Sequence, residues 1–304
     1  MRTGIRRRSV GAMLVAGVLV LGACGDGSGD GTEERPTITV GSTNLGEQLI
    51  LAEIYAQALE GAGYPVERSF NLGSREVVNP ALQTGQIDLM AEYTGSLLTF
   101  KGGTPSTDPD ETFAALQAAI EPDGLVALAY SPAEDKNGFV VTADTAARLG
   151  LTKVSDLQAH NGTLVLGGPP ECPQREFCLL GLESVYGLEF SDFRPLDVGG
   201  SLTVEALDGG EIDVALLFTS DGVIAARGFV LLEDDKLLQP SENVVPVLRQ
   251  EIVEAYGSEL TALLDAVSAK ITTDALSELN KRYGIDAADP EDLAREWLEA
   301  NGFL

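Results

Sequence analysis

A fifteen-residue pattern occurs twice in this chain and constrains its fold more than any other feature. The first copy begins at Ala81 and the second at Ala206, an offset of 125 positions. Both copies read Ala-Leu, two residues, Gly, one residue, Ile-Asp, and both later carry an aromatic residue followed by threonine. Each copy predicts the end of a helix, a glycine that stops it, and a short apolar strand. Two such units predict two similar α/β lobes.

The aromatic residue of each copy, Tyr93 or Phe218, falls at the carboxyl end of the predicted strand. Open α/β sheets bind ligands at that edge. A single aromatic ring at such a position is more often part of the core than a ligand contact. The repetition favours the second interpretation for these two rings, which would then face one shared cleft.

The remaining pattern alternates strands and helices, which indicates an α/β fold with parallel sheets. The turn-rich residues 131–137 mark the first crossover between lobes, and the chain returns after Phe218. We therefore predict a two-lobed α/β architecture in which residues 36–135 and 219–304 form lobe 1 and residues 136–218 form lobe 2. The final third is predicted to be helical at residues 252–267, 272–283 and 290–301.

Residues 1–23 have the features of a signal peptide. Four arginines, the first at Arg2, precede an apolar run of 12 residues from Val10 to Leu21, which is too short to span a membrane. The run ends in Leu-Gly-Ala-Cys, which resembles the lipobox of bacterial lipoproteins and predicts lipidation of Cys24. An ordinary signal peptide followed by a coincidental cysteine is the alternative. Residues 24–35 are a glycine-rich, polar tether, so we expect a protein anchored to the cell membrane and facing outside the cytoplasm.

The charge of the chain excludes some partners. Without the four leader arginines, 16 basic and 47 acidic side chains remain, a net charge of −31. Such a charge argues against nucleic acid as a partner and suits an exposed soluble domain, weakly favouring a cationic ligand. General solubility of exported proteins would explain the same excess.

The cysteines and the missing motifs narrow the chemistry. Cys172 and Cys178 lie six positions apart in an exported chain, so a disulfide is favoured over a metal site. With His160 as the single histidine and no nucleophile elbow or phosphate loop, no catalytic or metal constellation is evident. We expect a binding protein without metal or cofactor and not an enzyme.

An aromatic-lined cleft suits a quaternary ammonium group, which has no N–H to donate and is held by π faces and dispersion. Tyr93, Phe218 and Phe139, just past the crossover, are the candidate rings. If the ligand also carries a carboxylate, Arg175 inside the short cysteine loop is the candidate cation.

Beyond these features, the chain resembles the ProX/OpuC-type substrate-binding proteins of osmoprotectant ABC importers. Glu-Tyr-Thr-Gly at residues 92–95 and Asp-Asp-Lys at residues 234–236 are the most specific matches. The matching blocks follow the family's order over nearly the whole chain after the tether: residues 40–48, 70–73, 85–95, 181–182, 186–187, 220–222, 232–236 and 297–302.

The resemblance implies a type II periplasmic-binding-protein fold with a double crossover and a ligand cleft between the lobes. It also implies a glycine betaine, choline or carnitine-like ligand, an ABC permease as partner, and a monomer. Carried over position by position, the family's ligand contacts fall on these residues: Tyr93, Phe139 and Phe218 in the cage, Asn137 lining it, and Ser96, Arg175 and Thr43 at the carboxylate end.

Some positions depart from the family pattern. Phe139 and Phe218 replace tyrosines, Val204 replaces a further cage tyrosine, and Thr43 stands where some members have lysine. Two alternatives therefore stay open: a binding protein for a different small solute, such as an amino-acid betaine or a polar aromatic compound, and an exported enzyme.

Overall fold

The computed structural model describes residues 35–304. The predicted signal peptide, Cys24 and nearly all of the tether lie outside the described residues. None of the helices in the described range is long and apolar enough to cross a membrane.

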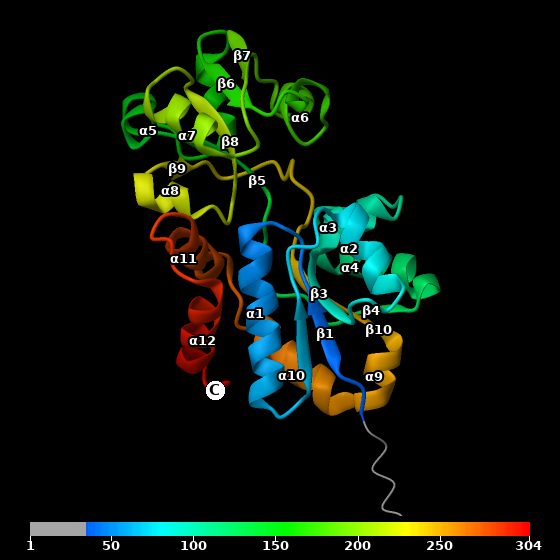
Figure 1. Ribbon diagram of the computed structural model, residues 1–304. Helices are drawn as coiled ribbons and strands as arrows, with labels where there is room; N and C mark the ends of the chain where they lie inside the picture. The colour runs from blue at the N-terminus through cyan, green and yellow to red at the C-terminus, as the bar shows by residue number, and fades with distance from the viewer. Residues whose placement is uncertain (1–34) are drawn as a thin grey trace, which may run out of the picture. The chain divides into compact units, whose positions relative to one another are not determined.

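The described chain contains two five-stranded sheets (Figure 1). In the first, the order is β2-β1-β3-β10-β4, and in the second it is β7-β6-β8-β5-β9. The central strand of the first sheet, β3, is parallel to β1 and antiparallel to β10. In the same way, the central strand of the second sheet, β8, is parallel to β6 and antiparallel to β5. The strands are β1 (Ile38–Gly41), β2 (Val66–Ser69), β3 (Leu89–Tyr93), β4 (Leu125–Ala127), β5 (Asn137–Val141), β6 (Val165–Gly168), β7 (Asp192–Pro195), β8 (Val214–Phe218), β9 (Val230–Leu231) and β10 (Val244–Arg249).

Helices cover both faces of each sheet. In the first lobe, α1 and the carboxyl-terminal helices pack on one face of the sheet and α2, α3 and α4 on the other (Figure 1). The α-helices are α1 (Gly46–Gly61), α2 (Arg75–Gln83), α3 (Thr94–Phe100), α4 (Pro109–Ile120), α5 (Ala143–Leu149), α6 (Leu179–Tyr186), α7 (Ser201–Asp208), α8 (Gly222–Arg227), α9 (Gln250–Tyr256), α10 (Ser258–Ser268), α11 (Thr273–Gly284) and α12 (Pro290–Asn301). Three 3-10 helices complete the set: η1 (Glu121–Asp123), η2 (Val154–His160) and η3 (Cys172–Gln174).

The predicted repeat is confirmed as a structural unit in both sheets. Gly85 and Gly210 both have positive φ, +75° and +70°, a conformation that glycine adopts without the strain a Cβ would add. Each copy's aspartate then links its strand to the parallel neighbour. Asp88 Oδ2 accepts from the Thr39 amide at 2.9 Å, and Asp213 Oδ2 accepts from the Val165 amide at 2.9 Å. The shared Ile-Asp therefore has a structural reason, because it fixes the same strand pairing twice.

Strand alternation decides which way the end of β3 points. Leu89, Ala91 and Tyr93 belong to the core beneath α1, whereas Met90 belongs to the core beneath α2 to α4. Successive side chains of a strand point to opposite faces. Tyr93 is therefore directed toward α1, and Glu92 toward α2.

The chain crosses between the sheets twice, from β4 to β5 and from β9 back to β10. The two crossing segments are bonded to each other, since the Asp135 amide donates to the Glu242 carbonyl at 3.1 Å. The strand pairing differs from the prediction after Phe218. Strand β9 pairs with β5, and Leu232 and Leu238 lie in the core of the second sheet, so the chain returns about twenty residues later than predicted.

The single helix predicted at residues 252–267 is two helices. Gly257 separates α9 from α10 with φ of 72° and ψ of −155°, which is not helical. Predicted helices 272–283 and 290–301 are confirmed as α11 and α12.

Candidate ligand-binding cleft

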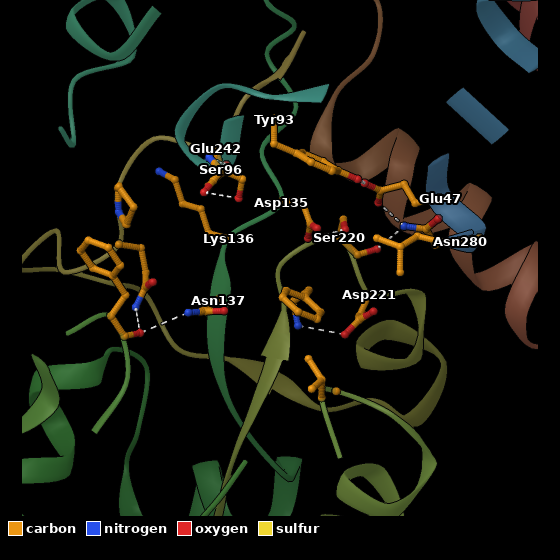
Figure 2. A pocket seen from close by; sticks show the side chains of 18 of the residues that line it. Glu47, Tyr93, Ser96, Asp135, Lys136, Asn137, Ser220, Asp221, Glu242 and Asn280 are labelled. Atoms are coloured by element: carbon orange, nitrogen blue, oxygen red, sulfur yellow. Dashed lines mark hydrogen bonds between the residues drawn. The ribbon is translucent and has the colours of Figure 1, made fainter. Parts of the chain in front are cut away.

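A cavity of about 710 Å³ is lined by residues from both sheets and from both crossing segments. In Figure 2, Glu242 lies beside Ser96, Tyr93 extends toward Glu47 and Asn280, and Asp135 and Ser220 lie between these two groups. Its lining is formed by Leu45, Gly46, Glu47, Arg75, Tyr93, Ser96, Asp135, Lys136, Asn137, Arg175, Phe177, Val198, Gly199, Phe218, Ser220, Asp221, Gln239, Pro240, Glu242, Asn280 and Tyr283.

Tyr93 is held in place at the end of β3 by a polar network. Its hydroxyl donates to Glu47, which lies in the first turn of α1, where a carboxylate suits the helix dipole. The Asn280 amide, from α11, donates to the same carboxylate and to the Ser220 carbonyl. Burial, and then the negative charge of Glu47, raise the pKa of the Tyr93 hydroxyl well above its ordinary value. The phenol therefore stays protonated and fixed as a donor, so its ring presents a constant face.

Ser96 and Glu242 form a second pair at the start of α3. Both the amide and the hydroxyl of Ser96 donate to the Glu242 carboxylate at 2.9 Å. Burial raises the pKa of Glu242 to about 7, although these hydrogen bonds and the charge of Arg75 act in the opposite direction. Glu242 lies in the returning crossover, just before β10, so this pair joins α3 to the crossing segment.

Two further carboxylates lie in or beside the crossing segments. Asp135 accepts from the Ser220 hydroxyl at 2.7 Å, and Asp221 accepts from the Phe218 amide at 2.9 Å. Burial raises the pKa of Asp221 to about 6, with a further contribution from Glu47. Burial and the neighbouring negative charges, that of Glu47 foremost, raise the pKa of Asp135 well above its ordinary range. Desolvation and like charges both oppose ionisation, so this wall favours an arriving cation.

Phe218 occupies the position in β8 that Tyr93 occupies in β3. Its ring is partly buried, and Gly199 beside it has a positive φ of +65°. A Cβ at Gly199 would lie 3.3 Å from the Phe218 ring. Glycine there leaves the ring its space at the edge of the cavity.

The disulfide loop forms the opposite edge. Cys172 and Cys178 are joined, as predicted, with their Cα atoms 5.2 Å apart. Asn137 and Gln239 both donate to the Phe177 carbonyl, at 3.2 and 3.0 Å, and attach this loop to the cavity wall. Arg175 is therefore presented to the cavity from a cross-linked segment.

Five of the seven predicted contacts lie in this cavity, namely Tyr93, Ser96, Asn137, Arg175 and Phe218. Thr43 lines a smaller cavity of about 250 Å³, which shares Tyr93 and Arg75 with the larger one. Phe139 lines neither cavity. Phe139 lies on β5 two residues after Asn137, and its side chain is only 2% exposed. It packs with Leu216 in the core of the second sheet. Val204 is likewise a core residue, 6% exposed.

Four further carboxylates, which we call the acidic wall, were not predicted: Glu47, Asp135, Asp221 and Glu242. In a chain this acidic, carboxylates are ordinarily solvated, so their number alone carries no signal. The place of a carboxylate in the chain is a better signal than the number of carboxylates. Asp135 and Glu242 lie on the two crossing segments, where the polypeptide must face the cleft. Asn280 gave no sequence signal, since it is one polar residue on an amphipathic helix.

Comparison with known proteins identifies the family. Residues 36–300 match the model of the substrate-binding domain of ABC-type glycine betaine transport systems. The chain belongs to this family. It is a solute-binding protein of an ABC transport system and not an enzyme.

Individual relatives agree with this assignment. The chain is 29% identical over 294 residues to a glycine-betaine-binding protein of Pseudomonas aeruginosa, with 93% of each chain covered. It is 28% identical to a carnitine transport binding protein of Listeria monocytogenes, with 96% of this chain and 95% of the relative covered. A crystal structure described as a glycine betaine/carnitine/choline ABC transporter has a TM-score of 0.81 at 26% identity, with 88% of this chain and 99% of that chain covered.

Proposed function

We propose that this protein binds a quaternary ammonium osmoprotectant, such as glycine betaine or choline, and delivers it to the permease of an ABC importer. The observation that carries the proposal is the combination of the Tyr93 and Phe218 rings with four carboxylates in one cavity. Aromatic faces attract a cation through their quadrupole, and the effect is largest where water is excluded. The relatives described above, which are named for glycine betaine and carnitine, support the same class.

The rings would hold the methylated ammonium, and polar groups would receive the rest of the ligand. Ser96, Asn137 and Arg175 lie in the cavity for that role. Arg175 is the group that would meet a ligand carboxylate, once it leaves Glu171, with which it forms an exposed ion pair at 2.9 Å. Exposed ion pairs contribute little to stability, so exchanging this partner costs little.

A binding panel tests the proposal. Choline, glycine betaine and carnitine are titrated into the protein by calorimetry, together with 3,3-dimethylbutan-1-ol, the uncharged carbon isostere of choline. We expect binding of at least one quaternary ammonium and none of the isostere, because only the charge differs. A ligand at 100 times its dissociation constant adds about 2.7 kcal/mol to the unfolding free energy, which a thermal melt detects. Equal binding of choline and its isostere would contradict the proposal.

A larger amino-acid betaine is the second candidate. The buried Oε1 of Gln48 has no hydrogen-bond partner among the described residues and lies at the smaller cavity beside Tyr93. A buried acceptor without a donor is costly, and a ligand N–H would satisfy it. A relative from Helicobacter pylori, 26% identical over 272 residues, is named for ergothioneine, although this chain spans only 48% of its length. Adding ergothioneine to the panel distinguishes this candidate, since Gln48→Leu should weaken its binding and not that of choline.

Membrane attachment through Cys24 is part of the proposal. The leader and the lipobox-like Leu-Gly-Ala-Cys carry it, and the permease supplies a reason to hold the protein at the membrane. Cys24→Ser should release the protein into the medium or leave it unprocessed. An unchanged membrane fraction in that variant would rule out lipidation.

A further inference from the structure

The basic and acidic residues that line the cleft differ in whether their charges are paired with an opposite charge. Three of them are basic, Arg75, Lys136 and Arg175, and four are acidic, Glu47, Asp135, Asp221 and Glu242. Their numbers are nearly equal, so the charge that a ligand meets depends on how each group is already paired.

Each basic group is paired with a carboxylate outside the lining. Arg75 makes two bonds of 2.8 Å to Glu92, which is only 2% exposed. Lys136 lies 2.8 Å from Glu134, and Arg175 lies 2.9 Å from Glu171. Their positive charges are therefore largely compensated before a ligand arrives.

The four acidic groups are held differently. Glu47 accepts from a phenol and an amide, Asp135 from a hydroxyl, Asp221 from a backbone amide, and Glu242 from a backbone amide and a hydroxyl. None of the four forms a salt bridge within residues 35–304. Neutral donors orient a carboxylate without cancelling its charge. Burial raises the pKa of Asp135, Asp221 and Glu242, and the hydrogen bonds from neutral donors only partly oppose it.

We propose that the cleft selects solutes of net positive charge, binding a quaternary ammonium alcohol such as choline more tightly than a quaternary ammonium carboxylate such as glycine betaine. This inference rests on the proposed function and narrows it. A zwitterion brings its own carboxylate into a cavity with four others, whereas Arg75 and Lys136 are engaged and Arg175 must first leave Glu171. Like charges brought together in a desolvated site oppose binding and thereby set specificity.

Three closely matched ligands test the inference. Choline, glycine betaine and glycine betaine methyl ester share the trimethylammonium group, and esterification removes only the carboxylate charge. Calorimetric titration at pH 8 and fixed ionic strength should give dissociation constants for choline and the ester that are at least about tenfold lower than for glycine betaine. Equal or tighter binding of glycine betaine overturns the charge selection and leaves the proposed function intact. Binding of none of the three overturns both.

Two substitutions test whether the acidic wall causes the preference. Glu242→Gln and Asp221→Asn keep the shape of the side chain and remove its charge. Each should therefore reduce the ratio of the dissociation constant for glycine betaine to that for choline by several-fold. Glu205→Gln, at an exposed position on α7, is the matched control and should leave the ratio unchanged. Thermal melting checks that each variant is folded. An unchanged ratio in both folded variants would refute the assigned cause, and the ligand series on the parent protein decides the selectivity if either variant fails to fold.

Discussion

Lowering the pH should weaken the binding of a cation such as choline, starting near pH 7. In the free protein, the pKa of Glu242 is raised to about 7 and that of Asp221 to about 6, in both cases mainly by burial. A bound cation stabilises the ionised carboxylates and lowers both pKa values. Binding therefore releases protons wherever these groups are protonated in the free protein, and affinity must increase with pH across that range.

The magnitude depends on how far the pKa values fall in the complex. If both return to their ordinary values, 4.5 for Glu242 and 3.8 for Asp221, each protonated group costs up to about tenfold in affinity per pH unit. Affinity should then fall by about tenfold from pH 7 to 6, and by about fortyfold from pH 6 to 5.

The charged groups around these carboxylates support that direction. Glu242 faces Ser96 on α3, Arg75 on α2 and Glu92 on β3, and the positive charge of Arg75 is directed mainly to Glu92. Asp221 faces Glu47 on α1. Among these neighbours, only Arg75 favours ionisation by its charge, and its effect does not offset burial.

Calorimetric titration with choline between pH 5 and 8, in two buffers of different ionisation enthalpy, measures affinity and proton release together. Glu242→Gln removes one titrating group, so its affinity should fall less steeply between pH 7 and 6, and Glu205→Gln should behave as the parent does. An affinity that is constant from pH 5 to 8, or net proton uptake on binding, would refute the reasoning.

Three further predictions concern the ring, a buried acid and the disulfide. Phe218→Ala should weaken binding of a quaternary ammonium by about thirtyfold, or about 2 kcal/mol, and should keep a near-native melting temperature because the ring is only partly buried. Phe218→Leu, which keeps the apolar bulk, should lose nearly as much affinity. A large fall in the melting temperature of Phe218→Ala would place the ring in the core. Because Glu242 has a raised pKa in the folded state, its ionisation destabilises the protein as pH rises through about 7. The melting temperature of Glu242→Gln, relative to that of the parent, should therefore increase between pH 6 and 8. A difference in melting temperature that is independent of pH would contradict this. Replacing Cys172 and Cys178 by serine should cost about 2 kcal/mol of unfolding free energy in denaturant titrations and weaken ligand binding; unchanged stability and affinity would show that the loop needs no cross-link.

The fold was predictable because its signals are local and repeated. A positive φ at Gly85 and Gly210 and the aspartates that follow them are fixed by short stretches of sequence. Periodicity also located α11 and α12, with their predicted bounds at most one residue from the observed ones. It did not find the break at Gly257, because the apolar spacing continues through the glycine on both sides.

The site was predictable only in part, because its contacts join distant segments. The end of a strand could be recognised, which placed Tyr93 and Phe218 in the cavity. Phe139 was misplaced because the depth of a residue along a strand depends on what packs above it, here the second core. In the acidic wall, only Asp135 lay in a predicted crossover. Glu242 could not be placed from the sequence, because the chain was predicted to return directly after Phe218.

The repeated and unrepeated parts of the chain contribute different things to the cleft. The repeat provides two similar sheets and one aromatic residue at the end of each central strand. The negative charge comes from elsewhere: Asp135 and Glu242 lie on the two crossing segments, which are bonded to each other at that position. A cation between these carboxylates would contact both connections between the sheets at once. The part of the chain that provides the negative charge of the cleft is therefore separate from the part that provides its rings.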